Sequence, residues 1–362
     1  MQNIPQHISL IAQKCRQKER ITVDEALALW HDAPLWLLAE LAVGRKREVS
    51  GDAVFYNRNF HLEPTNTCRF RCKFCSFRRG EGSEESWNYS IEEMEQIARG
   101  YVRSGVTEVH IVGGVHPSHN LEFFVELTRR IKSILPHVTI KAFTAIELSH
   151  MIHEAGLTPH EGLTMLKEAG MESIPGGGAE IFDEAIRREI CGDKGSTQEW
   201  FEIHDTAHRL AIPTNCTILY GHIESVEQRI NHLSMLRDQQ DKTGGFNAFI
   251  PLKYRAAHND MAHLGEVSVM EDLKMLSISR LFLDNIAHIK AYWVMYGKQT
   301  AELALSFGAD DIDGTIDDST KIYSMAGAED QRPRMTIEEI HSMASRAGLR
   351  AVERDTNYNI IS

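Results

Sequence analysis

The sequence predicts a (β/α)8 barrel of the TIM type, with a helical extension before it and a shorter segment after it. Strand-like runs alternate with amphipathic helical runs along most of the chain, which is the pattern of parallel βαβ units. About eight such units fit before the C-terminal segment, enough to close a barrel, and a six-stranded open barrel is the nearest alternative. We therefore expect a helical extension at 1–50, the barrel at 51–320 and a packed C-terminal segment of helix and extended chain at 321–362.

The extension and the first barrel unit follow from local signals. Apolar residues, Trp30 among them, recur at helical spacing between residues 22 and 41. Residues 60–65 form the first predicted strand, which ends in a loop rich in cysteine. Ser90 then begins a helix, because Glu93 stands three residues later at the position of a capping-box partner.

The same alternation continues through the barrel. Residues 108–114 form a buried apolar strand that ends in glycines. A helix begins at Thr158 and Pro159, with Glu161 at the capping-box position. Further strands are predicted at 138–144, 171–175, 213–220, 246–253, 289–295 and 310–315. Further helices are predicted at 121–134, 197–210, 225–241 and 268–287, and a capped helix begins at Thr336.

The composition is that of a globular protein. The 362 residues are 42% hydrophobic and 25% charged, which excludes a disordered or collagen-like chain. No basic stretch followed by an apolar run opens the chain, and no window has the length of a membrane span, so we expect a cytoplasmic protein with no membrane partner. The net charge of −12 argues against a nucleic-acid partner, which would require a basic face.

Three cysteines, Cys68, Cys72 and Cys75, follow the first predicted strand with the spacing Cys-x3-Cys-x2-Cys. Three thiolates can hold an iron-sulfur cluster and leave one iron without a protein ligand, where a small molecule can chelate. The alternative is a structural zinc ion completed by His61 or His110. Zinc sites usually bring their ligands in two pairs, and no second pair is present, so the cluster is favoured. The scattered Cys15, Cys191 and Cys216 are interpreted as ordinary buried thiols.

A local group of cations lies beside these cysteines. Positive charge there would favour anionic ligands and a docking electron donor. Solvated loop charges are an equally good interpretation of any single member. The group consists of Arg69, Arg71, Lys73, Arg78 and Arg79.

The ends of the second, third and fourth predicted strands carry candidate binding residues, because a barrel of this type places its site at the carboxyl ends of the strands. Gly113 and Gly114 permit close approach of a ligand to the backbone, or simply a tight turn. Glu147 can accept hydrogen bonds from ribose hydroxyls, or can cap the next helix. Glu180 follows three glycines and is expected to border a nucleoside.

The fifth and sixth predicted strands add polar groups. Asn215 and Tyr220 are unusual in a buried strand. Lys253 and Arg255 suit a substrate with carboxylates, since arginine pairs with them bidentately; surface positions are the alternative for both. His116, after Gly114, is the histidine that we expect to be catalytic.

The cysteine run resembles the signature of radical S-adenosylmethionine (SAM) enzymes, and Phe74 matches the aromatic position of that signature. The resemblance implies a radical SAM barrel with a 4Fe-4S cluster whose open iron takes the amino and carboxylate groups of SAM. One electron from the cluster would then release a 5'-deoxyadenosyl radical. The implied cofactor-binding residues are Phe74, Gly113, Gly114, Glu147, Glu180 and Asn215.

Several segments together resemble the aminofutalosine synthase family of the futalosine route to menaquinone. The resemblance runs from about residue 50 onward and rests on residues 63–66, 109–117, 176–180, 249–253 and 311–316. It implies a transferase that joins the adenosyl radical to 3-[(1-carboxyvinyl)oxy]benzoate, with loss of CO2, to give 6-amino-6-deoxyfutalosine. SAM would be consumed as a co-substrate.

The implied partners are the dicarboxylate substrate, bound by Tyr220, Lys253 and Arg255, and a reducing donor of the flavodoxin or ferredoxin type. Dehypoxanthine futalosine cyclase and the deazaflavin-cofactor synthases share the barrel and similar glycine loops, and are the alternatives within the superfamily. A non-catalytic zinc or iron-sulfur protein is the alternative from another class.

Overall fold

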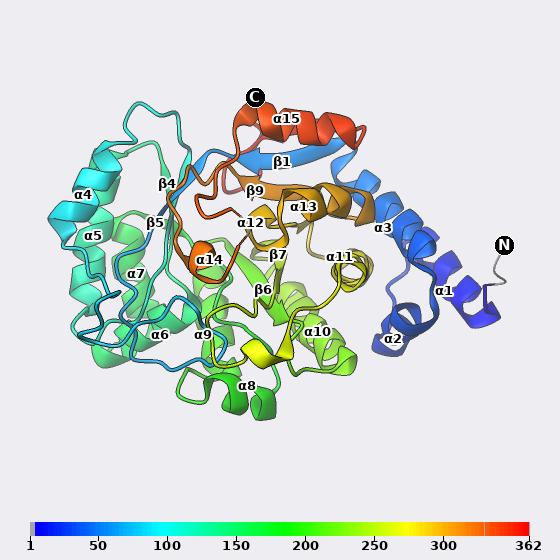
Figure 1. The fold of residues 1–362 in the computed structure, drawn as a ribbon, viewed down its shortest axis with the longest axis horizontal. Coiled ribbons are helices and arrows are strands. Elements are labelled where there is room, and N and C mark those ends of the chain that lie inside the picture. The colour runs from blue at the N-terminus through cyan, green and yellow to red at the C-terminus, as the bar shows by residue number, and fades with distance from the viewer. Residues whose placement is uncertain (1–3, 329, 362) are drawn as a thin grey trace.

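The computed structural model describes residues 4–328 and 330–361 and contains an α/β barrel with parallel strands (Figure 1). Three helices precede the barrel and lie at one side of it. They are α1 (Gln6–Arg16), α2 (Val23–Asp32) and α3 (Leu35–Ser50). α3 packs against α11 (Val269–Phe282), so the extension is attached to an outer helix of the barrel.

The wall of the barrel is a ring of parallel strands. β1 (Ala53–Asn57) and β2 (Asn59–Leu62) share one position in this ring, separated by Arg58. β1 pairs with β9 on one side and β2 pairs with β3 on the other, while single bridges join β5 to β6 and β8 to β9. The described residues therefore provide eight strand positions in a closed ring. The others are β3 (Glu108–Ile111), β4 (Thr139–Ala142), β5 (Met171–Ser173), β6 (Thr214–Tyr220), β7 (Phe246–Lys253), β8 (His288–Ile289) and β9 (Asp311–Gly314).

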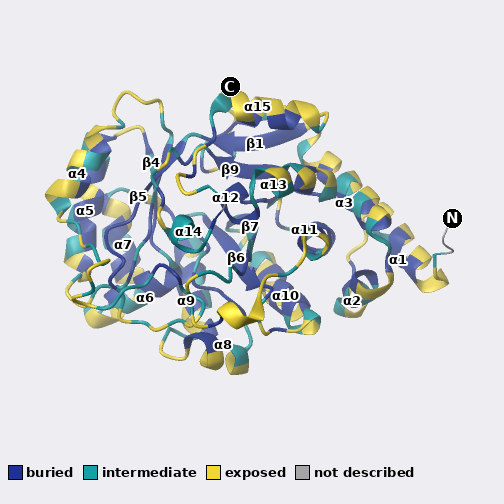
Figure 2. Cartoon of the chain, viewed as in Figure 1, coloured by how far each residue is buried: buried dark blue, intermediate teal, exposed yellow. Residues whose placement is uncertain are grey.

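Helices cover the outside of the ring with their buried faces turned inward (Figure 2). Many begin with a capping box, and three caps are predicted from the sequence: Ser90 with Glu93, Thr158 with Glu161, and Thr336 with Glu339 at the start of the C-terminal helix Ile337–Arg346. The outer helices are α4 (Ile91–Arg99), α5 (Leu121–Ile134), α6 (Ala145–Glu154), α7 (Pro159–Ala169), α8 (Glu184–Cys191), α9 (Thr197–Arg209), α10 (Val226–Thr243) and α11.

The C-terminal part adds short elements and one further strand. β10 (Arg350–Glu353) pairs with β1 on the side opposite β9. The other elements are α12 (Trp293–Tyr296), α13 (Lys298–Ala304), α14 (Ile322–Met325), α15 (Ile337–Arg346) and the short 3-10 helices Ala262–Leu264 and Leu305–Phe307.

The strands alternate apolar residues that pack against the helices with polar residues that face the inside of the ring. Phe60 and Leu62 belong to the main hydrophobic core, whereas Asn59 and His61 are the buried polar residues between them. The interior of the barrel is therefore polar, unlike the Val, Ile and Leu layers that usually fill it.

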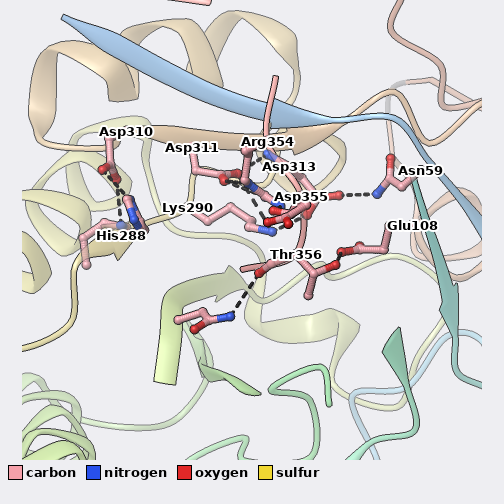
Figure 3. Close-up of polar contacts among 12 residues, drawn as sticks. Asn59, Glu108, His288, Lys290, Asp310, Asp311, Asp313, Arg354, Asp355 and Thr356 are labelled. Carbon is pink, nitrogen blue, oxygen red and sulfur yellow. Dashed lines mark hydrogen bonds and ion pairs between the residues drawn. The ribbon is translucent and has the colours of Figure 1, made fainter. Parts of the chain in front are cut away.

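Ion pairs neutralise the charges inside the barrel. Lys290 Nζ lies 2.5 Å from Asp313 Oδ1, and Arg354 Nη2 lies 2.6 Å from Asp311 Oδ2 (Figure 3). Glu108 is 2.6 Å from the Nζ of Lys141 and also accepts from Thr356, which follows β10. Pairing on this scale is required because an isolated buried charge is very costly.

The expectation of a strand over residues 289–295 is wrong beyond its start. β8 ends at Ile289, and the apolar residues after it form α12. All four α12 residues are buried, so their periodicity does not distinguish a buried helix from a buried strand. β1, α6, α8 and β10 are not among the predicted elements.

Within the described part of the chain, no helix combines the length and the apolar character that a membrane crossing requires.

Candidate active site

The cysteine loop, defined here as residues 63–88, packs directly on the loop that follows β3. Gly114 N donates to Thr65 O over 2.7 Å, and Arg69 N donates to Val115 O over 2.9 Å. Val115 N donates to the Sγ of Cys68 over 3.3 Å. The two loops thus form one layer at the carboxyl ends of β2 and β3, and a backbone N–H is aimed at a thiol.

Glycine is required at this contact. A Cβ on Gly114 would stand 2.4 Å from Thr67 O and 3.1 Å from the Cβ of Cys68, and one on Gly113 would stand 2.9 Å from Thr65 O. Because these neighbours are mostly backbone, they cannot move aside cheaply. The sequence left open a ligand or a tight turn at these glycines; the structure places the cysteine loop against them, and the approach of a ligand stays a prediction.

The three predicted ligands lie together in this loop. Burial raises the pKa of Cys68 and of Cys75, and the charge of Cys72 raises both further. Three free thiols in one loop, with an N–H donated to one sulfur, are the donor set that an iron-sulfur cluster uses. Among the described residues, no three His, Cys, Asp or Glu side chains converge on the position of a single metal ion.

Cys191, expected to be an ordinary thiol, lies beside Cys72. A hydrogen bond between the two thiols, together with burial, raises the pKa of Cys72, and the same bond lowers the pKa of Cys191. The backbone fixes this proximity, since Lys73 N donates to Ile190 O over 2.8 Å. This contact could not be predicted from the sequence, because Cys191 lies far from Cys72 along the chain, at the end of α8.

Glu180, Lys194 and Phe74 form a group next to Cys72. Glu180 follows β5 in the left-handed region, with φ of 48°, and forms an ion pair with Lys194. Lys194 Nζ lies 5.8 Å from the centroid of the Phe74 ring. Burial opposes the charge of Lys194, but Glu180 and the neighbouring cysteines outweigh it and raise its pKa. The group places a cation close to the cysteine loop.

Glu147 caps α6 and also holds the glycine loop. Its Oε2 accepts from Thr144 N over 2.8 Å, and its Oε1 accepts from Gly113 N over 3.0 Å. Burial raises the pKa of this carboxyl to about 7. The sequence left two roles open for Glu147, a contact with ribose hydroxyls and a helix cap. The structure shows the helix cap.

Tyr220 and Lys253 converge on a residue that the sequence did not single out, Asp272 of α11. Tyr220 Oη donates to Asp272 Oδ1 over 2.6 Å, and Lys253 Nζ donates to Asp272 Oδ2 over 2.9 Å. Both side chains therefore lie against an outer helix and tie β6 and β7 to it.

Arg255 lies just beyond β7 and contacts the segments above the barrel. It donates to Met295 O over 3.2 Å and to Gly327 O over 2.8 Å, and its Nε lies 3.3 Å from Glu266 Oε1. A guanidinium has five N–H groups; two of them donate these hydrogen bonds, and Nε, although near Glu266, has no hydrogen-bond partner among the described residues.

Asn215 and His116 occupy different depths. Asn215 is 5% exposed, and Gly176 approaches its backbone so closely that a Cβ would stand 2.8 Å away. His116 is half-buried, its Nδ1 accepts from Ser118 N over 3.1 Å, and its ring stacks on His119 at 4.5 Å. Asn215 is part of the barrel wall, whereas His116 belongs to the loop at its rim.

A cavity of about 460 Å³ lies beside the cysteine loop. Its lining includes Phe70 from that loop and Arg187, Arg188 and Lys194 from α8 and the residues after it. The lining also includes Glu184, Asp193 and Glu199, so the cavity carries charges of both signs.

The sequence reasoning considered His61 and His110 only as ligands of the alternative zinc ion, and it did not single out Lys141. They lie on β2, β3 and β4, paired in register inside the barrel. The signal that could have found them is a polar residue at every second position of otherwise apolar strands.

Two family models cover most of the chain. Residues 62–236 match the radical SAM superfamily, and residues 243–362 match the CofH/MqnC C-terminal region. Among solved structures, methylornithine synthase (PylB) has a TM-score of 0.75 at 16% identity, covering 94% of this chain and 97% of that one. This likeness concerns the fold.

Named relatives are similar over nearly their whole length. The chain is 39% identical to aminodeoxyfutalosine synthase of Streptomyces coelicolor, over 97% of this chain and 93% of the relative. It is 38% identical to aminodeoxyfutalosine synthase of Thermus thermophilus, over 96% and 94%. It is also 38% identical to 5-amino-6-(D-ribitylamino)uracil–L-tyrosine 4-hydroxyphenyl transferase of Methanothermobacter thermautotrophicus, over 99% of each chain.

Members of this superfamily bind an iron-sulfur cluster at the cysteine motif, so the cluster is correct and the zinc ion is not. The protein is therefore an enzyme that needs a small-molecule substrate and an electron donor. Its three cysteines, glycine loop and parallel barrel agree with that membership. The chain belongs to the radical SAM superfamily, whose members use a 4Fe-4S cluster and S-adenosylmethionine.

Proposed function

We propose that this enzyme is an aminodeoxyfutalosine synthase of menaquinone biosynthesis. It would transfer the 5'-deoxyadenosyl group of SAM to 3-[(1-carboxyvinyl)oxy]benzoate and release CO2, giving 6-amino-6-deoxyfutalosine. The observation that carries the proposal is the identity of 39% and 38% to two aminodeoxyfutalosine synthases over nearly the whole chain. Atoms and electrons balance when the adenosyl radical and the ionised substrate together lose CO2 and one electron, so the electron that cleaves SAM is returned.

Cys68, Cys72 and Cys75 would hold the cluster, which supplies the electron that releases the adenosyl radical. Gly113 and Gly114 would offer their carbonyl oxygens to the methionine end of SAM, since their amides are engaged by Glu147 and Thr65. The N–H of Val115 at Cys68 would tune the cluster, since hydrogen bonds to its sulfur ligands shift the reduction potential.

Phe74, Glu180 and Asn215 are proposed to border the nucleoside. Glu147 would act on the same ligand through Gly113, whose amide it holds in place. His116 is the proposed catalytic histidine and would hold or relay a proton while the radical collapses, through the Nε2 that its contact with Ser118 leaves free.

On the substrate side, Arg255 is the proposed partner of a carboxylate, because three of its five N–H groups donate no hydrogen bond among the described residues. Tyr220 and Lys253 would support the wall through Asp272, which engages both. These contacts favour a positioning role for Tyr220 and Lys253 over direct substrate contact.

An acidic donor of the flavodoxin or ferredoxin type is the proposed source of electrons. Arg69, Arg71 and Lys73 are exposed at alternate positions of the loop that carries the cysteines. Complementary charge would steer such a donor to the shortest path to the cluster.

Anaerobic reconstitution tests the proposed function. The holoenzyme, supplied with SAM, a reductant and the enol-ether benzoate, is expected to form a product that retains adenine, identified by mass spectrometry. Free 5'-deoxyadenosine as the stoichiometric product would favour the cyclase or the 4-hydroxyphenyl transferase reaction. Each alternative substrate, offered in parallel, provides the comparison.

A further inference from the structure

His61, His110 and Lys141 form a row across three neighbouring strands inside the barrel. His61 pairs in register with His110, and His110 pairs in register with Lys141. Side chains at paired positions of adjacent strands point to the same face. The two imidazole rings meet edge to face, with centroids 4.7 Å apart.

The row lies directly below the site loops. β2 leads into the cysteine loop, β3 leads into Gly113 and Gly114, and β4 leads into Thr144 and the cap of α6. A molecule held by the row would therefore extend toward the loops where the adenosyl group is released.

Three ring nitrogens of this row have no hydrogen-bond partner among the described residues. His61 is 2% exposed, yet neither of its ring nitrogens has a partner among the described residues, and Nε2 of His110 has none either. His232 contrasts with them, since its ring meets Phe182 N at 3.1 Å and Thr217 O at 2.8 Å. Burying a polar group without a hydrogen-bond partner is unfavourable. A polar ligand would remove that cost.

The charged groups around the row are already paired with one another. The unpaired N–H groups that could donate to a ligand therefore belong to the row. Lys290 is bound to Asp313, and Lys141 is bound to Glu108. Burial lowers the pKa of His61 to about 4 and lowers the pKa of His110 as well. Both imidazoles are neutral near pH 7, and each has one N–H to donate. Lys141 keeps two further N–H groups.

We propose that this row binds the benzoate carboxylate of the substrate and so sets its position and the specificity of the enzyme. Imidazole and ammonium N–H groups suit a carboxylate, which accepts on both oxygens. The carbon that the adenosyl group attacks belongs to the enol ether, at the opposite end of the molecule. With that end at the loops, the benzoate end reaches down to the row. The inference rests on the proposed function and deepens it.

Paired ligands test the row. The holoenzyme and its His61→Leu and His110→Leu variants are titrated with the substrate and with 2-phenoxyacrylate, which lacks only the benzoate carboxylate. The wild type is expected to prefer the substrate by roughly 10- to 100-fold, the range of one or two charge-assisted hydrogen bonds. Each variant should lose most of this preference while its affinity for 2-phenoxyacrylate is unchanged.

His204→Leu is the matched control. His204 is equally buried and also has an unpartnered Nε2, but it lies on α9, outside the ring of strands. This variant should keep the wild-type preference. His61→Gln provides a second, polar replacement if leucine prevents folding.

A crystal structure of the wild-type holoenzyme with the substrate supplies a readout that needs no variant. A carboxylate within hydrogen-bond distance of His61 and His110 supports the inference; water at these nitrogens, with the substrate bound elsewhere, overturns it. If the wild type forms product and the leucine variants keep its full preference for the substrate over 2-phenoxyacrylate, the inference is overturned and the proposed function stands. A wild type that binds neither compound overturns the proposed function and the inference with it.

Discussion

Oε1 of Glu147 accepts a hydrogen bond from the backbone amide of Gly113 over 3.0 Å, while the other oxygen caps α6. One carboxylate thereby joins the loop after β3 to the loop after β4. The conformation of the glycine loop is set by a residue on another βα unit.

Replacing Glu147 by alanine should weaken both stability and SAM binding. The cap is lost and the Gly113 amide is left without its partner, which together should cost about 1–3 kcal/mol of unfolding free energy. Glu161→Ala removes the same capping-box residue from α7, on the exposed surface. It should lower stability less and leave the dissociation constant of SAM unchanged. Equal loss of SAM affinity in both variants would contradict the link through Gly113.

A Gly114→Ala variant should fail to retain iron. The added Cβ would stand 2.4 Å from Thr67 O, so the glycine loop or the cysteine loop must move. Iron content and the visible absorption of the cluster after reconstitution are the measurements. Gly44→Ala, in α3 with nothing within 4 Å of the new Cβ, is the control and should be neutral or stabilising by up to about 1 kcal/mol. Full iron content in the Gly114 variant would show that the two loops adapt.

The cysteines should separate into ligands and neighbours. Cys72→Ala should abolish cluster assembly, whereas Cys191→Ala should retain the cluster, because three thiolates complete the protein ligation. Cys216→Ala, which changes a buried thiol in β6, controls for the loss of any sulfur. Loss of iron from the Cys191 variant comparable to that from the Cys72 variant would make Cys191 a ligand.

Acid should destabilise the fold through its buried histidines. Burial lowers the pKa of His232 to about 3, below the ordinary 6.5. The neutral ring therefore contributes its full stability above pH 6.5, and this contribution is lost as the pH falls from 6.5 toward 3. The slope is about 1.4 kcal/mol per pH unit for one such group. Urea unfolding of His232→Gln at several pH values should show a shallower decline than the wild type, while exposed His160→Gln should follow the wild type.

Charge reversal should affect the protein donor but not a small reductant. Arg71→Glu with Lys73→Glu should slow SAM cleavage driven by an acidic flavodoxin about 10-fold or more at low salt, because steering is lost. Cleavage driven by dithionite should keep its rate. Arg209→Glu is the control, because it reverses an exposed charge on α9, away from the cysteine loop. It should keep the wild-type rate with both reductants. An equal effect on both reductants would place the defect in the site itself.

Structural features that depend on residues only a few positions apart can be predicted well from the sequence. The capping boxes of Ser90 with Glu93 and Thr158 with Glu161 are confirmed because cap and partner are three positions apart. The carboxyl ends of the strands could be located by the glycine and polar residues that follow them.

Side-chain partners from distant segments could not be predicted. Lys253 has the pattern of a substrate cation, but α11 brings Asp272 to it. His61 and His110 become neighbours only through the register of β2 and β3, which no local pattern specifies. Both cases concern what lies opposite a residue, which is a property of the assembled barrel.

The position of β1 between β9 and β10 has a consequence for the order of folding. The strand that leads into the cysteine loop is held by partners from the far end of the chain: Arg58 binds Glu353, 295 residues away, and Asn59 binds Asp313, 254 residues away. Closing loops of this length makes these contacts slow to form. The cysteines are therefore synthesised early, but the contacts that fix the strand before them form late in folding. A fragment that ends before β9 would keep the pairing of β2 with β3 but lose the pairing of β1 with β9 and β10, so we expect cluster insertion to follow barrel closure.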